Sequence, residues 1–214
     1  MARTAIVFCA GGPARASLPD LPDDVLVIAA DAGVAEAERL AFRVDLLVGD
    51  LDSAEPDAVA RVEGAGGTVQ RHPVDKDASD LELAMEAAAA AEVRRIVVVG
   101  GGRGRLDHLL GNALLLSSER WRGIEVDAVL GAARLHVIRD DRSFDGTPGE
   151  LISLFAVDGP ARVAATEGLR WSLRDEDLSP GSSRGLSNEF IASRARIDVT
   201  EGVLIAIRPG TEEA

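Results

Sequence analysis

Short, continuous apolar runs alternate with amphipathic or alanine-rich segments over the first part of the chain. Uninterrupted apolar runs bounded by polar residues indicate strands that are buried on both faces of a sheet. The runs that fit this pattern cover residues 4–10, 25–31, 45–50, 94–101 and 124–130. Between them, helical patterns cover residues 33–42, 56–64, 79–92 and 106–118. This alternation predicts an α/β domain with a mostly parallel sheet, in which ligands bind beyond the carboxyl ends of the strands.

The pattern changes near residue 133, where helical segments give way to short segments bounded by Gly, Pro, Asp and Ser. In several of these segments apolar and polar residues alternate, which is typical of half-buried antiparallel strands. The candidate strands are "RLHVIR", "ELISLFAV", "ARVAATEG", "LRWSLRD", "SRARIDVT" and "GVLIAIRP", and the polar stretch 175–190 is expected to be a surface loop. We therefore predict an α/β domain over residues 1–132 and a small all-β domain over residues 133–214.

Composition narrows the classes of function. The 214 residues include 36 acidic and 23 basic side chains, a net charge of −13. This excess argues against a nucleic acid held by its phosphates and against an anionic membrane surface, although a local arginine or a metal ion can still bind a phosphate ligand. No segment approaches the ~20 apolar residues of a membrane span, and the N-terminal run is too short for a signal peptide, so we expect a cytoplasmic protein. Cys9 is the only cysteine and is expected to be buried.

Acidic residues follow the predicted strands. Asp31 ends one strand, and Asp50 and Asp52 follow another with one residue between them. Because the carboxyl ends of parallel strands share one edge of the sheet, these carboxylates should lie together, and hard oxygen ligands of this kind suit Mg²⁺ with substrate phosphates. Asp80, at the start of a predicted helix, is a fourth candidate. The structural alternative is that Ser79 caps this helix and that Asp80 lies in its first turn, where the helix dipole favours an acidic residue. In the same alternative, Asp31 is a turn residue.

A glycine- and arginine-rich segment, "VVVGGGRGRLDHLLGN" (97–112), connects a predicted strand to a predicted helix. Backbone N–H groups at such a position favour phosphate, and Arg103 and Arg105 can bind phosphate oxygens in bidentate fashion. The segment lacks the Gly-Lys-Ser/Thr ending of a P-loop. Its structural alternative is a turn with a solvated arginine and Asp107 as a helix cap. The combination with Asp107 and His108 favours phosphate binding, and the choice between Arg103 and Arg105 stays open.

Six segments, in this order, resemble the thiamine pyrophosphokinase family: "ADAG" (30–33), "VGDLDS" (48–53), "DKDASDLELA" (75–84), "GRLDHLLGN" (104–112), "TEGLRWSL" (166–173) and "SN" (187–188). The resemblance covers nearly the whole chain, and the order and spacing of the six segments make it specific. Two positions depart from the family pattern. Ser79 stands where threonine is usual, and Arg103 replaces the first of two adjacent glycines.

This resemblance implies an α/β nucleotide-binding catalytic domain, a C-terminal β-sandwich that binds thiamine and forms the dimer, and active sites at the interface of a homodimer. It implies transfer of a pyrophosphoryl group from ATP to the hydroxyl of thiamine, with Mg²⁺, giving thiamine diphosphate and AMP. Carried over residue by residue, it assigns Asp50, Asp52 and Asp80 to the metal, and the same three residues with Arg105 and Asp107 to catalysis. The residues that it assigns to the nucleotide are Asp31, Lys76, Asp77, Ser79, Arg105 and His108. Those that it assigns to thiamine are Trp171, Ser187 and Asn188.

Three alternatives accompany this interpretation. Trp171 alternates with Leu169 and Leu173 on a predicted strand, so a core position competes with a contact to thiamine. Either Asp52 or Asp80 can be the base that accepts the hydroxyl proton. A non-catalytic nucleotide- or thiamine-binding module of the same fold would keep part of the pattern, but the retained acids argue against it. Another nucleotide-dependent transferase, such as a D-x-D glycosyltransferase, would also keep part of the pattern, but the short β domain and the "GRLDH" segment argue against it.

Overall fold

The computed structural model describes residues 3–100, 102 and 105–210. The chain forms two compact units. The first contains the chain up to Leu115 together with Arg120–Ala132, and the second contains Leu116–Glu119 together with the chain from Ala133 onward.

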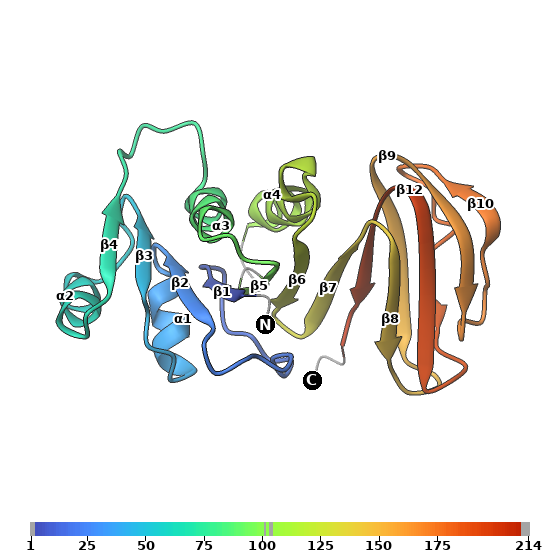
Figure 1. Cartoon of the computed structure of the whole chain (residues 1–214), viewed down its shortest axis with the longest axis horizontal. Helices are drawn as coiled ribbons and strands as arrows, with labels where there is room; N and C mark the ends of the chain where they lie inside the picture. Colours follow the sequence, from blue (N-terminus) through green and yellow to red (C-terminus); the bar gives the residue numbers. More distant parts are fainter. Residues whose placement is uncertain (1–2, 101, 103–104, 211–214) are drawn as a thin grey trace. The chain divides into compact units, whose positions relative to one another are not determined.

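A parallel sheet forms the centre of the first unit (Figure 1). Its strands are β1 (Thr4–Phe8), β2 (Leu26–Ala30), β3 (Leu46–Gly49), β4 (Thr68–Arg71), β5 (Arg95–Val99) and β6 (Glu125–Leu130). They lie in the order β4-β3-β2-β1-β5-β6, and each neighbouring pair is parallel. The central strand β1 is buried along its whole length, which explains its uninterrupted apolar sequence. The sequence missed β4, because its residues "TVQR" are largely exposed and carry no apolar run.

Helices cover both faces of this sheet (Figure 1). They are α1 (Gly33–Arg39), α2 (Pro56–Gly64), α3 (Asp80–Ala90) and α4 (Leu106–Ser117), followed by a short 3₁₀ turn at Glu119–Trp121. Residues of α1 and α2 share one hydrophobic core with β1, β2, β3 and β5, whereas α3 and α4 lie on the opposite face. Among the helices in the described ranges, none has the length and apolar character needed to cross a membrane.

The second unit consists of antiparallel strands. They are β7 (Ala133–Ile138), β8 (Asp141–Asp145), β9 (Leu151–Glu167), β10 (Arg174–Leu178), β11 (Asn188–Glu189) and β12 (Arg194–Arg208). The long strands β9 and β12 pair with each other on both sides of register shifts that lie between Asp198 and Val203. The first half of β9 pairs with β11 and the second half of β12 with β7, while the opposite halves pair with β10 and β8.

Both halves of these long strands contribute to one hydrophobic core. Ile152 and Leu154 from the first half of β9 lie in the same cluster as Ala161 and Val163 from its second half. The two halves therefore belong to two layers that pack face to face, which is the arrangement of a β-sandwich. The predicted fold class, an α/β domain with a mostly parallel sheet followed by a small all-β sandwich domain, is confirmed.

Some predicted strand boundaries were wrong. "ELISLFAV" and "ARVAATEG" form the single strand β9, because Asp158 and Gly159 with φ of 58° and 125° bend the strand without ending it. The predicted strand over 169–175 is instead a bent segment in which Leu169 makes an isolated bridge to Phe190, and β10 begins at Arg174. The stretch 175–190 therefore begins with most of β10 before its turns.

Candidate active site

Three aspartates converge at the carboxyl edge of the parallel sheet. Asp31, Asp50 and Asp52 each place a carboxylate oxygen within 4.8 Å of the others. Asp31 directly follows β2 and Asp50 directly follows β3, and these two strands are parallel neighbours. The backbone N–H of Asp52 donates to Asp50 Oδ1 at 3.2 Å, so the turn after β3 folds back on its own carboxylate. The spacing of two acids after one strand and one acid after its neighbour thus becomes a compact acidic cluster.

Asp31 is the buried member of this cluster. The residue is only 8% exposed. Its Oδ1 atom is buried and has no hydrogen-bond partner within the described part of the chain. Burial raises the pKa of Asp31, and the carboxylates of Asp80, Asp50 and Asp52 raise it further. A buried carboxyl oxygen without a partner carries a large desolvation penalty. Such a group, surrounded by other acids, fits the position of a bound cation.

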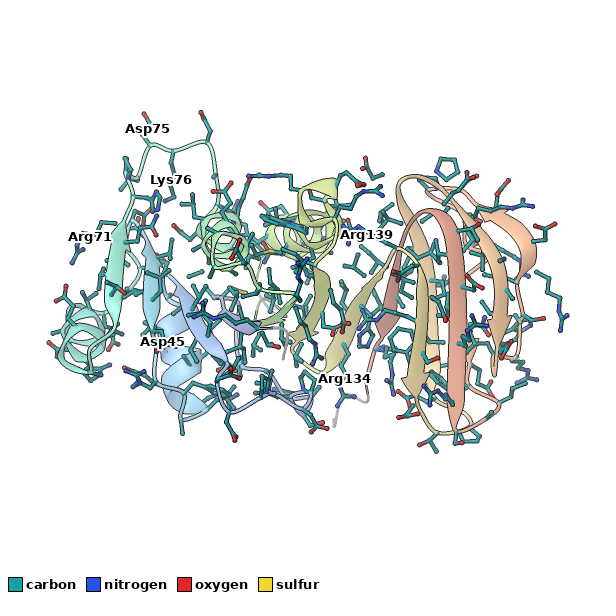
Figure 2. All side chains as sticks on the ribbon, in the orientation of Figure 1. Asp45, Arg71, Asp75, Lys76, Arg134 and Arg139 are labelled. Carbon is teal, nitrogen blue, oxygen red and sulfur yellow. The ribbon has the colours of Figure 1, made fainter. Side chains whose placement is uncertain are left out.

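Lys76 supplies positive charge beside the cluster. Figure 2 shows it in the loop between β4 and α3, and its Nζ atom lies 2.5 Å from Asp50 Oδ2 and 3.1 Å from Asp80 Oδ1. The hydrogen bond with Asp50 holds the pKa of Lys76 above its usual value and the pKa of Asp50 below its usual value. Lys76 therefore bridges the end of β3 and the start of α3, and it partly neutralises the acids in the absence of a ligand.

Gly49 allows Asp80 and Asp31 to approach each other. It ends β3 with a φ of 148°, which favours glycine. A Cβ atom at this position would lie 3.0 Å from Asp80 Oδ1 and 3.2 Å from Asp31 Cβ. Any side chain would therefore push these groups apart. Gly49 lies within the segment "VGDLDS", but the sequence alone does not reveal this role.

Asp80 also occupies the first turn of α3, as the structural alternative expected. Ser79 is the N-cap, and its Oγ accepts a hydrogen bond from the N–H of Glu82 at 3.2 Å. The capping interpretation and the functional one are therefore compatible, because the cap orients α3 so that Asp80 contacts Lys76.

A cleft of about 380 Å³ contains most of these side chains. Of the predicted site residues, those that line it are Asp31, Asp52, Lys76, Ser79, Asp80 and His108. The sequence missed Cys9, Ala10, Ser53, Val74 and Asn112, which also line it. These residues form no recognisable chemical motif, and only their positions after β1, β3 and β4 or on α4 reveal them. Burial raises the pKa of the Cys9 thiol to about 12. Because only a thiolate is nucleophilic, Cys9 lines the cleft as an inert side chain.

Other predicted residues lie outside the lining of this cleft. Arg105 donates from Nε and Nη2 to the two carboxylate oxygens of Asp107 at 3.1 and 2.6 Å, and both side chains are exposed. This pairing holds the pKa of Asp107 below its usual value. Asp77 is exposed in the loop before α3. Arg103, the competing candidate for phosphate binding, lies outside the described residues.

The predicted thiamine-binding residues lie in the second unit. Trp171 is 48% exposed, so the alternative of a core tryptophan is wrong. Its backbone N–H donates to Asn188 Oδ1 at 3.0 Å, and Asn188 Nδ2 donates to the carbonyl of Trp171 at 2.8 Å. Asn188 is itself buried. Ser187 adopts a φ of 54° and its N–H donates to Ser153 Oγ at 3.0 Å. The structure therefore brings Trp171 and Asn188 together, with the amide group of Asn188 bound to the main chain of Trp171.

Comparison with known families covers both units. Residues 21–127 match the family model described as thiamin pyrophosphokinase, catalytic domain. Residues 135–204 match the model described as thiamin pyrophosphokinase, vitamin B1 binding domain. The chain belongs to the thiamine pyrophosphokinase family. The family suggested by the six sequence segments is thereby confirmed.

Individual members of this family are similar over nearly the whole chain. The thiamine pyrophosphokinase of Bacillus subtilis is 28% identical over 95% of this chain and 97% of its own length. The crystal structure of the thiamine pyrophosphokinase from Bacillus subtilis superposes with a TM-score of 0.82 at 25% identity, covering 98% of this chain and all of the other. The thiamin pyrophosphokinase from Geobacillus thermodenitrificans gives a TM-score of 0.74 at 28% identity, covering 98% of this chain and 99% of the other.

Proposed function

We propose that this chain transfers a pyrophosphoryl group from ATP to the hydroxyl of thiamine, giving thiamine diphosphate and AMP. One observation carries the proposal: in a member of the thiamine pyrophosphokinase family, the carboxylates of Asp31, Asp50 and Asp52 lie together. One of their oxygens, Asp31 Oδ1, is buried without a hydrogen-bond partner among the described residues. Lys76 lies beside them in the same cleft. Carboxylates with an adjacent cation are suited to a polyphosphate that carries a divalent metal ion.

Mg²⁺ is the metal that these residues fit. Three carboxylate oxygens from Asp31, Asp50 and Asp52 lie close enough to share one ion, and oxygen donors are the ligands that Mg²⁺ prefers. This set adds Asp31 to the three metal ligands that the family resemblance implies, while Asp80 borders the cluster through its contact with Lys76. When bound, Mg²⁺ would neutralise charge on the phosphate oxygens and orient them.

The residues of the cleft would act mainly by positioning and by neutralising charge. In the reaction the hydroxyl of thiamine would lose its proton to the base, either Asp52 or Asp80, and its oxygen would form a bond to the β-phosphorus of ATP. The bond from that phosphorus to the oxygen shared with the α-phosphate would break. AMP leaves with the electron pair of that bond. Lys76 is placed to exchange its contact with Asp50 for a phosphate oxygen, because its ammonium group already lies at the edge of the cleft. Positioning and electrostatic stabilisation dominate catalysis of this kind of transfer.

The nucleotide contacts are extended by residues from three further places. Ser79 and Asp77 precede α3, His108 lies on α4, and we propose that all three contact ATP. Arg105 would exchange its partner Asp107 for phosphate when the nucleotide binds. Both side chains are exposed and are therefore able to move.

For thiamine, we propose Trp171 as the aromatic surface on which the rings stack, with Ser187 and Asn188 beside it. A thiazolium cation over an indole ring gains a cation–π interaction. In this proposal residues 1–132 bind the nucleotide, and residues 133–214 bind thiamine and form a homodimer with active sites at the subunit interface. The partners are therefore ATP, thiamine and a second copy of the chain, without nucleic acid or membrane. A cytoplasmic location stays a prediction from the sequence.

Release of AMP that depends on thiamine tests the proposal. Purified protein with ATP, Mg²⁺ and thiamine should yield AMP and thiamine diphosphate in equal amounts. Asp52→Asn should lower the rate at least ~10²-fold, the scale for removing one strong electrostatic contact. Asp24→Asn, which changes an exposed aspartate outside the cleft lining, is the matched control and should keep its activity. ADP as the product, or full activity of Asp52→Asn, would contradict the proposal, and binding of both substrates without AMP would favour a non-catalytic module.

A further inference from the structure

Trp171 is exposed, yet its main chain is held firmly. The segment 168–171 runs beside the segment 188–191, joined by a hydrogen bond from Ile191 N–H to the carbonyl of Gly168 and by one from Arg170 N–H to the carbonyl of Glu189, each 2.9 Å long. The buried amide of Asn188 adds two more hydrogen bonds, to the N–H and the carbonyl of Trp171. These contacts fix the backbone, but none of them involves the indole ring.

A cation covers one face of this ring. The central guanidinium carbon of Arg170 lies over the Trp171 ring, 5.1 Å from its centroid. The same guanidinium group pairs with Glu189, whose Oε2 atom lies 3.0 Å from Arg170 Nη1. Glu189 is more buried than Arg170, so the carboxylate anchors the arginine, and the arginine in turn restrains the ring.

We propose that Arg170, anchored by Glu189, is a positioning residue that orients the Trp171 ring for thiamine and reserves one face of the ring. This inference rests on the proposed function of Trp171 in thiamine binding. A cationic thiazolium would be repelled by a guanidinium group on the same face, so thiamine stacks on the opposite face. Because the ring is already ordered, less rotamer entropy is lost on binding.

The chain offers a direct readout of the ring itself. It contains two tryptophans, and Trp121 is only 2% exposed whereas Trp171 is 48% exposed. Quenching of fluorescence by the neutral quencher acrylamide therefore reports mainly on Trp171. Removal of the arginine uncovers one face of the ring. In the absence of any substrate, acrylamide should therefore quench the tryptophan fluorescence of Arg170→Ala more strongly than that of the wild type.

Kinetics then connect the ring to thiamine. Arg170→Ala should raise KM for thiamine about two- to fivefold, the scale of one exposed cation–π contact, with KM for ATP and kcat unchanged. Arg170→Lys, which keeps a cation over the ring, should restore most of the wild-type KM and quenching. Glu189→Gln, which removes the anchoring charge, should fall between the wild type and Arg170→Ala. Arg174→Ala is the control for charge, because it removes an exposed arginine four positions after Arg170, and it should behave as the wild type.

Wild-type quenching and wild-type KM in Arg170→Ala would overturn the proposal, and so would a lower KM, which would mean that Arg170 competes with thiamine for the ring. An effect of Arg174→Ala equal to that of Arg170→Ala would also overturn it, since a general charge effect would then suffice. The failure of the proposed function is separate: a wild-type protein that releases no AMP contradicts that function. In that case acrylamide quenching without substrate still tests whether Arg170 orients the Trp171 ring. Quenching after the addition of thiamine alone tests whether the ring binds thiamine.

Discussion

The acidic cleft of the first unit and the Trp171 region of the second are built in opposite ways. In the cleft, Asp31 and Asp50 directly follow paired parallel strands, and like charges are forced together with one oxygen buried and unpaired within the described residues. Around Trp171, an exposed ring projects from a bent segment whose main chain is hydrogen-bonded to the segment 188–191. The cleft thus holds unfavourable electrostatic energy that the proposed cation would relieve, whereas the polar groups of the Trp171 main chain already have hydrogen-bond partners.

This contrast predicts that substitutions in the cleft change activity most, while substitutions near Trp171 change affinity and stability. It also predicts opposite signs for stability. Removal of a carboxylate from the cleft should relieve repulsion, but removal of a polar group near Trp171 should leave hydrogen-bonding groups unpaired.

The largest effect is expected for Asp31→Asn. It should lower AMP release at least ~10²-fold, because one strong electrostatic contact of the proposed metal site is lost. In metal-free protein it should instead stabilise the fold at neutral pH by about 1 kcal/mol, because a neutral amide replaces a buried charge that the neighbouring carboxylates repel. Activity assays and thermal unfolding in the presence of a chelator measure the two effects.

The pH dependence of this stabilisation has a defined sign. In the folded protein the pKa of Asp31 is raised by burial and by neighbouring carboxylates, so the unfolded chain ionises this group at lower pH than the folded chain. Wild-type stability therefore falls relative to Asp31→Asn as the pH rises through the interval between the two pKa values. The two proteins should converge below that interval. A variant that is less stable than the wild type at neutral pH would contradict this account of the cleft.

Gly49→Ala should have the next largest effect. An added Cβ would lie 3.0 Å from Asp80 Oδ1 and 3.2 Å from Asp31 Cβ, so one or both carboxylates must shift. A displacement of ~1 Å can cost about 10²-fold in rate, so a smaller shift should lower kcat about tenfold. Gly64→Ala, where nothing lies within 4 Å of an added Cβ, is the matched control and should retain activity. Equal activities of the two variants would mean that the approach of Asp80 and Asp31 has no part in catalysis.

The smallest effect on catalysis is expected for Asn188→Ala. It removes both partners of the Trp171 main chain and should destabilise the protein by about 1–3 kcal/mol, the cost of buried groups left without hydrogen bonds. Its kcat should stay near the wild-type value, whereas KM for thiamine and the fluorescence of Trp171 should change. Asn112→Ala, which removes an amide from the cleft of the other unit, should leave the fluorescence unchanged. Wild-type stability of Asn188→Ala would show that the amide is not a structural anchor.

The acidic cleft was largely predictable because its residues are defined by local pattern. An apolar run predicts a buried strand, and parallel pairing brings the residues that follow neighbouring strands to one edge. Asp31, Asp50 and Asp52 therefore met as expected. Ser79 and Asp80 were predicted both as a helix start and as site residues. The structure contains the helix start and places both residues in the lining of the cleft, and their functional role stays a prediction.

The Trp171 region was predicted less well. Alternation of Leu169, Trp171 and Leu173 suggested one strand face, yet Leu169 and Leu173 are buried while Trp171 is exposed in a bend. The difference arises from hydrogen bonds to a segment 17 positions away, and the periodicity of a single segment holds no information about such a partner. Arg170 and Glu189 were missed for the same reason.

Apart from β4, the sequence by itself determined the order of strands and helices along the chain of the first unit, the position of its acids at strand ends and the family to which the chain belongs. These features depend on local burial and on motifs read in order. Only the tertiary structure decided that Gly49 lets Asp80 approach Asp31, that Lys76 bridges Asp50 and Asp80, and that Arg170 covers Trp171. Each of these contacts joins residues whose distance depends on strand register and loop path, and those are set by packing of the whole unit and not by any one segment.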